Sequence, residues 1–426
     1  MNGDLKKILS NTLWMIFDKV FLLVLNLIVT VKIANYFGAV EYGNYQYAVS
    51  VVAILEIFVT FVDGRVIKKR YITNNPDNLV FNATICRGIF SGGAVLIGLI
   101  FIFAARRGVQ FSLMFSILLI NSILVNLRFG MVNRFEYLLK SKKTVIAADT
   151  SALLSSVLQL VAVQFQCSII MISVIAAISS GMNLCIVAIQ YKNDFANRTK
   201  LYFDKKLIKD LIKESTPLAI AASCAIIYTR CDSVMLGSMM TAAEVGIYSI
   251  SIKLISVVQI VISPIRESVY PKLISLYAKD KKEYARRYIQ ISGLLTWIYI
   301  GGVLLSFIVL PYALRLLKPE YAEAFPVYRI HVIGTFFMYN AALRAGHYTL
   351  INRGSILTYS QMVSVIVNIV MNIVGIKYFG MYGAALATVV TQGLSLFVSN
   401  LVFGKDGREV FIWQIKALNP LSMFGC

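Results

Sequence analysis

The sequence predicts an all-α, polytopic membrane protein with about 12 transmembrane helices. Of its 426 residues, 58% are hydrophobic and 15% are charged, and the mean hydropathy is +0.73. Soluble domains average about 45–50% apolar and about 25% charged residues. The chain therefore has too few polar residues to cover a water-facing surface. At about 20 apolar residues per span and about 15 per connection, its length suits roughly 12 spans.

The apolar runs give the same number. The first, from about Ser10 to Ala34, is too long for the core of a signal peptide and has no small-residue cleavage site behind it, so it is interpreted as a spanning helix. The remaining predicted spans are approximately 43–64, 81–104, 109–130, 144–165, 168–190, 215–237, 245–270, 288–317, 326–350, 356–377 and 381–403.

The excess of basic residues fits this topology. The chain has 41 Lys and Arg against 21 Asp and Glu, a net charge of +20, which in a soluble protein would suggest nucleic acid. With the N-terminus in the cytoplasm, 28 of the 41 basic residues fall in cytoplasmic segments and 5 in outer ones. Cytoplasmic loops of membrane proteins are rich in Lys and Arg. The charge thus predicts cytoplasmic N- and C-termini and no nucleic-acid partner.

A polar stretch and a repeat divide the chain. Residues 191–214 alternate lysines with apolar residues, which is typical of an amphipathic helix on the inner leaflet. They separate an N-terminal six-helix bundle, 1–190, from a C-terminal one, 215–403, which a cytoplasmic tail follows, 404–426. The pattern Glu-x-Gly-x-Tyr occurs at Glu41–Tyr45 and again at Glu244–Tyr248. It predicts a duplication with two parallel bundles related by a pseudo-twofold axis along the membrane normal.

Several kinds of chemistry are not expected. The six cysteines are scattered and form no disulfide framework, and with only two histidines a metal site is not predicted. No Gly-x-x-x-x-Gly-Lys-Ser/Thr sequence exists, so direct use of ATP is not expected. A membrane glycan polymerase or acyltransferase would need a catalytic constellation and a large outer loop, and neither is found. The sequence predicts a protein that is not an enzyme and has no catalytic residues and no cofactor.

The sequence also resembles a known family at several places in order along the chain: Asn11–Trp14, Ala34–Gly38, Glu41–Gly43, Arg230–Gly237, Glu244–Ser249, Tyr378–Thr388 and Phe411–Lys416. These stretches are similar to those of Wzx-like O-antigen (polysaccharide) flippases, in the multidrug/oligosaccharidyl-lipid/polysaccharide (MOP) exporter superfamily. One departure is Asn35, where the family often has Arg.

The resemblance implies a MATE-like fold, with two six-helix bundles around a cavity that opens alternately to each side of the bacterial cytoplasmic membrane. It implies a lipid-linked oligosaccharide cargo on undecaprenyl pyrophosphate, an O-antigen or capsule/exopolysaccharide repeat unit, moved from the inner to the outer leaflet. Glycan polymerase and chain-length proteins are implied as partners in lipopolysaccharide or other polysaccharide biosynthesis.

Basic residues inside the predicted spans are the first candidates for function. Charges in spanning helices are costly and usually face a cavity or a partner. A pyrophosphate cannot cross hydrocarbon, and fixed positive charge offsets its desolvation. The predicted substrate-binding residues of this cationic cavity are Arg230, Lys253, Arg344, Arg87, His347 and Arg266. Arg266 lies close to the inner boundary, so an interfacial position remains open for it.

Acidic residues are candidates for ion coupling. Glu56, Thr60 and Asp63 follow one another at i, i+4 and i+7 on one helix face. A buried carboxylate can carry a proton or bind sodium, and the predicted coupling residues are Asp232, Glu56, Asp63 and Asp18. Whether H+, Na+ or no ion is coupled stays open, as does a structural ion pair for Asp232.

A multidrug or organic-cation antiporter of the same superfamily is the alternative function. Its cavity would be rich in carboxylates and aromatic faces. Here eight basic and six acidic residues lie within the predicted spans, which favours an anionic cargo.

Overall fold

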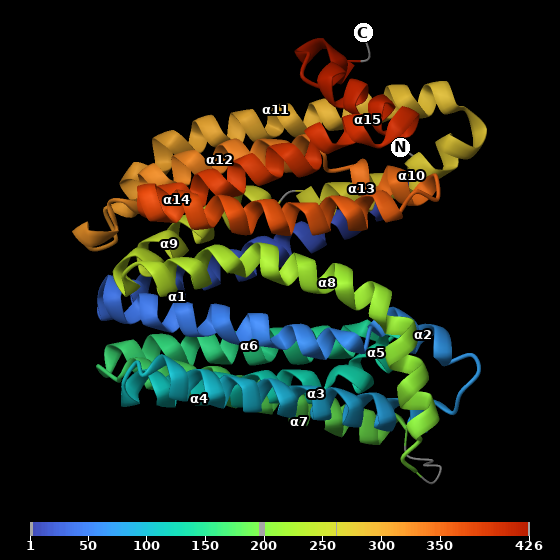
Figure 1. Cartoon of the computed structure of the whole chain (residues 1–426). Coiled ribbons are helices and arrows are strands. Elements are labelled where there is room, and N and C mark those ends of the chain that lie inside the picture. Colours follow the sequence, from blue (N-terminus) through green and yellow to red (C-terminus); the bar gives the residue numbers. More distant parts are fainter. Residues whose placement is uncertain (1–2, 196–200, 261, 425–426) are drawn as a thin grey trace. The chain divides into compact units, whose positions relative to one another are not determined.

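The computed structural model describes residues 3–195, 201–260 and 262–424, with side chains from Phe21 to Ser422 within those ranges. The described part is helical and contains no strand (Figure 1). Its helices are α1 Gly3–Leu55, η1 Glu56–Phe61, α2 Gly64–Arg70, α3 Pro76–Ala105, α4 Val109–Leu127, α5 Phe129–Tyr137, α6 Ser141–Gln164, α7 Ile169–Asp194, α8 Lys205–Met239, α9 Ala242–Gln259, α10 Ile262–Lys279, α11 Lys281–Leu314, η2 Pro319–Tyr321, α12 Ala324–Asn340, α13 Arg344–Leu350, α14 Ser355–Leu396, η3 Val398–Val402, α15 Gly404–Lys416 and η4 Pro420–Phe424.

The predicted polytopic membrane fold is confirmed. Nine helical stretches of the described chain are long and apolar enough to cross a membrane. Two of them contain a glycine in a left-handed conformation, Gly38 at φ 76° and Gly380 at φ 55°, and each is two helices joined by a kink. Dividing them there gives eleven spans. The 17-residue α12 is the twelfth, so the helices account for all twelve predicted runs.

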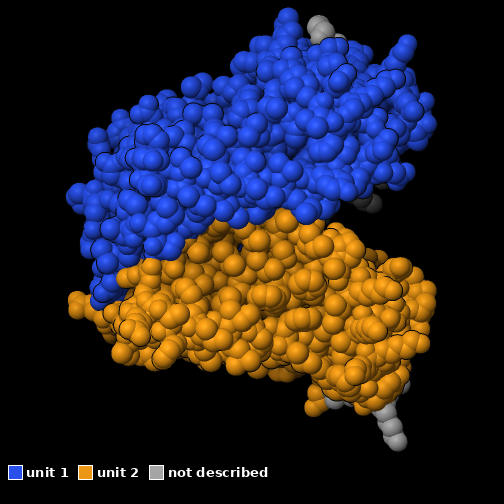
Figure 2. Space-filling view, in the orientation of Figure 1, with its two compact units in different colours: residues 1–43, 235–426 blue, residues 44–234 orange. Residues whose placement is uncertain are grey.

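The chain forms two compact units (Figure 2). Unit 1 comprises residues 1–43 and 235–426, and unit 2 comprises residues 44–234. The chain passes from one unit to the other within α1 and again within α8. These boundaries differ from those of the predicted bundles, 1–190 and 215–403. The predicted bundles rest on a repeat in the sequence, and the duplication stays a prediction.

The predicted linker is partly a continuation of a spanning helix. Residues 205–214 are the first turns of α8, and residues 196–200 lie outside the described ranges. Leu207 and Leu211 are buried in a core of unit 2 together with Val62 and Ile67. Leu207 and Leu211 on the apolar face of these turns are therefore covered by protein, and the position of the linker on the inner leaflet stays a prediction.

The predicted tail is also helical. In α15, Val410 and Trp413 are buried against Tyr284 and Tyr288 of α11. The tail is thus a packed part of unit 1.

The glycines of the Glu-x-Gly-x-Tyr repeat lie against each other. A Cβ atom on Gly43 would overlap the carbonyl group of Ala242, and one on Gly246 would overlap the carbonyl oxygen of Ala39. Small residues let two membrane helices bring their backbones together. The two copies of the repeat therefore form a close crossing of α1 and α9 within unit 1.

The kink at Gly38 is held by the segment around η2. The break leaves backbone N–H groups of the second half of α1 without helical partners, and Glu320 Oε1 accepts a hydrogen bond from the N–H of Ala39 at 3.0 Å. Asn35 binds the same segment twice, because its Oδ1 accepts from the N–H of Lys318 at 2.9 Å and its Nδ2 donates to the carbonyl of Leu316. Tyr321 donates its hydroxyl to the carbonyl of Ala34 at 3.2 Å. Asn35, the departure from the family pattern, is thus a structural residue.

Replacing Asn35 with alanine should destabilise unit 1 by about 1–2 kcal/mol, because two hydrogen bonds to the η2 segment are lost. The measurement is the midpoint of thermal unfolding of the purified protein in detergent. Tyr36→Phe is the matched control, since Tyr36 is the next residue of the same helix and is exposed. An unchanged midpoint for Asn35→Ala would show that these bonds do not stabilise the kink.

Candidate functional site

The second predicted span is interrupted in unit 2. Its helix tightens into η1, Val62 is extended, and a new helix, α2, begins at Gly64. Backbone groups at such a break need partners, because hydrocarbon offers none. The carbonyl of Val62 accepts from Arg87 Nη2 at 2.8 Å, and the N–H of Asp63 donates to Ser215 Oγ at 3.0 Å.

Arg87 is fixed on three sides. Besides the Val62 carbonyl, its Nη1 donates to Asn126 Oδ1 at 3.0 Å, and its guanidinium carbon lies 3.1 Å from the centre of the Phe129 ring. α3 supplies the arginine and α4 the asparagine. The predicted cavity residue Arg87 therefore has a structural task, which is to close the helix break.

Glu56 begins the break and lies among polar groups. Its Oε1 accepts a hydrogen bond from Ser122 Oγ at 2.6 Å, and the guanidinium groups of Arg87 and Arg230 lie near enough to attract its carboxylate. The side chain of Arg230 is exposed, and within the described residues no carboxylate lies at ion-pair distance from it. The structure thus brings together three predicted site residues, Glu56, Arg87 and Arg230.

The other acidic candidates have different surroundings. Asp63 caps the N-terminus of α2, and its Oδ2 lies 2.8 Å from Arg65 Nη2. Asp232 is 7% exposed and accepts a hydrogen bond from the Cys231 thiol at 3.5 Å. The side chain of Asp18 lies outside the described side chains.

In unit 1 the predicted basic residues are spread over several helices. Arg266 of α10 is exposed and Lys253 of α9 is half-buried. His347 is 4% exposed, and its Nδ1 lies 2.8 Å from the Tyr284 hydroxyl, among the rings of Tyr288 and Trp413. This histidine belongs to the aromatic core of unit 1.

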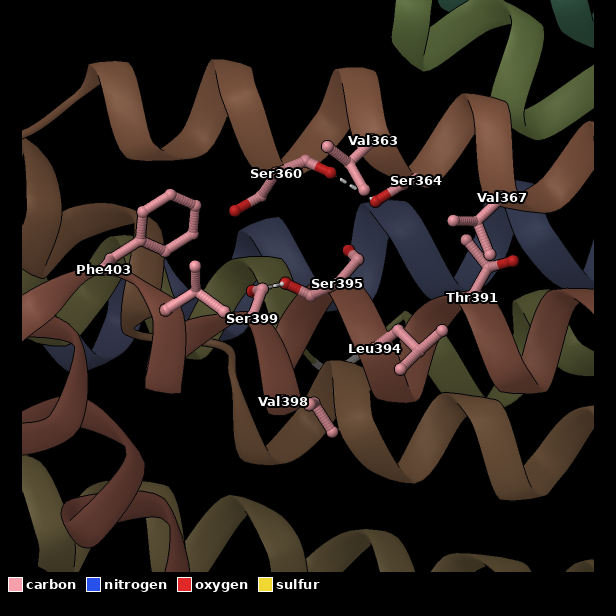
Figure 3. Close-up of a pocket in the computed structure, with 11 residues that line it drawn as sticks. Ser360, Val363, Ser364, Val367, Thr391, Leu394, Ser395, Val398, Ser399 and Phe403 are labelled. Atoms are coloured by element: carbon pink, nitrogen blue, oxygen red, sulfur yellow. Dashed lines mark hydrogen bonds between the residues drawn. The ribbon is translucent and has the colours of Figure 1, made fainter.

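Arg344 starts α13 and is 4% exposed. Its Nε donates to Asn400 Oδ1 at 2.7 Å, and its Nη2 donates to Ser360 Oγ at 3.0 Å and to Ser399 Oγ at 3.2 Å. Ser360 and Ser399 also line a cavity of about 270 Å³ between the part of α14 before the kink at Gly380 and a wall formed by the end of α14 and η3 (Figure 3).

Sequence reasoning missed the uncharged partners of these charges. Ser122 and Asn126 of α4 hold Glu56 and Arg87, and Ser360, Ser399 and Asn400 hold Arg344. Ser122 and Asn126 stand four residues apart in an apolar run. That spacing places both residues on one helix face. It is the feature of the sequence that could have identified them as partners.

Comparison with known proteins identifies the family. Residues 8–277 match the model of the polysaccharide biosynthesis protein family, and the chain belongs to that family. No curated protein matches the chain.

Solved structures of transporters share the fold. A lipid II flippase, MurJ, in an inward closed conformation is 14% identical with a TM-score of 0.70, over 94% of this chain and 90% of that one. An inward-facing multidrug resistance MATE family transporter of the MOP superfamily is 12% identical with a TM-score of 0.67, over 92% and 99%. The Vibrio cholerae MATE transporter VcmN in the bent form is 12% identical with a TM-score of 0.56, over 96% and 99%. The predicted MATE-like fold is confirmed.

Proposed function

We propose that this protein flips an undecaprenyl pyrophosphate-linked oligosaccharide from the inner to the outer leaflet of the bacterial cytoplasmic membrane. The membership in the polysaccharide biosynthesis protein family and the transporter fold support this function. The distribution of Lys and Arg supports cytoplasmic termini. The observation that carries the proposal is the group formed by Glu56, Arg87 and Arg230 at the break in the second span.

This group suits an anionic cargo. Arg87 is occupied by the helix break, whereas Arg230 is exposed and can meet a phosphate. The Glu56 carboxylate offsets one of the two guanidinium charges while no cargo is bound. An arriving pyrophosphate would be repelled by the Glu56 carboxylate, so uptake of a proton by Glu56 would favour cargo binding. Glu56 is therefore the proposed coupling residue, and the proton is the proposed ion.

The remaining candidates have secondary roles in the proposal. Lys253 and Arg266 offer further positive charge in unit 1, and Asp232 is a second carboxylate in unit 2. An organic-cation antiporter is disfavoured, because Arg87 and Arg230, which lie near Glu56, would repel a cation.

Deletion of the gene tests the proposed function. The strain should lose its surface polysaccharide and accumulate lipid-linked repeat units on the inner leaflet, because polymerase and chain-length proteins act on the outer side. Both are measured by extraction of lipid-linked oligosaccharide and by staining of surface glycan, with a plasmid-borne copy as the control. Normal glycan together with increased sensitivity to cationic dyes would favour the antiporter instead.

A further inference from the structure

The last spanning segment exposes an apolar face up to its end. No charged residue occurs between Lys377 and Lys405. Exposed apolar side chains of α14 and η3 follow one another here at every fourth residue, which in a helix places them on one face. They are Leu386, Val390, Leu394, Val398 and Val402. Such a face meets lipid chains, so the hydrocarbon region ends near Val402, which is 80% exposed, and before Lys405.

The tail helix α15 starts at this boundary and has a fixed orientation. The chain bends at Phe403 and turns at Gly404, whose backbone is left-handed with φ 68°. Gln414 ties α15 to the end of the span, because its Nε2 donates to the Leu396 carbonyl at 3.1 Å and its Oε1 accepts from Asn400 Nδ2 at 2.7 Å. These bonds fix the rotation of α15 about its own axis.

The face of α15 opposite Gln414 combines apolar and basic side chains. Two isoleucines are exposed on it, Ile412 at 50% and Ile415 at 45%. Three basic side chains are exposed beside them: Lys405, Arg408 and Lys416. Their spacing of three or four residues from one to the next keeps all five on one side of the helix. This group is called the tail face.

The positive charges of the tail face are not neutralised by the protein. Asp406 pairs with Arg353 at 3.2 Å. Within the described residues, no carboxylate lies at ion-pair distance from the three basic side chains of the tail face. Glu409 is exposed next to them. Three positive side chains and one negative one give this surface a net charge of +2.

We propose that the tail face binds the bilayer surface at the end of α14 and selects anionic phospholipid there. Ile412 and Ile415 enter the boundary between head groups and acyl chains, and the three basic side chains contact the phosphate groups. Basic and apolar side chains together are typical of helices that lie at a membrane interface. Basic residues next to a span attract anionic lipid.

A bilayer matches the tail face better than an acidic protein does. Either partner would neutralise the basic side chains, but the bilayer also takes up the two isoleucines and is already in contact with Val402 next to α15. In the proposed topology this surface is the inner leaflet. The proposal does not depend on the cargo or on the flippase activity.

Photocrosslinking from the tail face tests the proposal. The full-length protein carries p-benzoylphenylalanine in place of Ile412 and is reconstituted in vesicles of phosphatidylcholine and phosphatidylglycerol. After irradiation, lipid adducts are identified by mass spectrometry. Phosphatidylglycerol should be enriched in the adducts about fivefold over its share of the vesicle lipid, which is the preference that one basic residue near the surface gives. The same amino acid in place of Leu394 is the control, and its adducts should have the composition of the vesicle.

Charge variants show whether the basic side chains make the selection. Combining Lys405→Gln, Arg408→Gln and Lys416→Gln should remove the enrichment, while lipid adducts persist because the apolar side chains remain. The matched control combines Arg315→Gln, Arg329→Gln and Lys377→Gln. These three residues are also exposed and lie toward the other ends of their spans, so the enrichment should stay.

Three results would overturn the proposal. The first is the absence of lipid adducts at position 412 while position 394 gives them. The second is a lipid composition at position 412 that equals that of the vesicle. The third is a crosslink from position 412 to another protein in whole cells in place of lipid, which would assign the tail face to a protein partner.

Discussion

Replacing Gly43 with valine should remove most folded protein, with a loss of stability above about 3 kcal/mol. The new side chain would overlap the backbone carbonyl of Ala242, which cannot turn aside as a flexible side chain can. The measurement is the yield of monodisperse protein in size-exclusion chromatography, together with its unfolding midpoint. Gly246→Val should have the same effect, since Gly246 meets the backbone of Ala39 at the same crossing.

Gly92→Val provides the matched control. Gly92 also lies in a spanning helix, α3, but no atom lies within 4 Å of the position that its Cβ would take. This variant should fold normally. If Gly43→Val were recovered in the same yield as Gly92→Val, the two copies of the repeat would not form a close helix crossing.

Replacing Arg230 with glutamine should lower flipping about 10- to 100-fold, because a charge-assisted contact with the cargo phosphate would be lost. Folding should be unchanged, since the Arg230 side chain is exposed. The measurement is the amount of lipid-linked oligosaccharide that a deletion strain delivers to the outer leaflet when it carries the variant. Membrane levels of the protein are measured in the same cells.

Arg329→Gln is the control for charge alone. Arg329 is an exposed arginine of the spanning helix α12, in the other unit. Its loss removes the same charge and should leave flipping near the wild-type level. Full activity of Arg230→Gln, or an equal loss with Arg329→Gln, would show that the break in the second span does not contact the cargo.

The spans could be predicted from the sequence, because hydropathy measures directly what a bilayer selects. The break at Glu56–Val62 could not. Glu56–Phe61 continues an apolar run, and nothing local requires the helix to stop there. The break is stabilised by Arg87 and Ser215, which are distant in sequence.

The candidate site could be predicted only in part, again because its contacts join residues that are distant in sequence. Charged residues stand out in an apolar run, so Glu56, Arg87 and Arg230 could be named. Their grouping depends on how α3, α4 and α8 pack, which one sequence does not reveal. His347 and Arg344 are three residues apart in the sequence, but the His347 ring contacts Tyr284 while Arg344 donates to Asn400. The spacing of two residues on a helix shows which way their side chains point, but it does not show which residues those side chains contact.

The hydrogen bonds of His331 bear on how the protein is made. α12 has 17 residues and carries Arg329 and His331. His331 is bound to α9, with Nδ1 3.0 Å from Ser251 Oγ and Nε2 3.1 Å from the Tyr248 hydroxyl. A transmembrane segment that carries polar residues inserts poorly on its own from the translocation channel into the bilayer. We therefore expect α9, which is made earlier, to stay near the channel and receive α12 during biosynthesis.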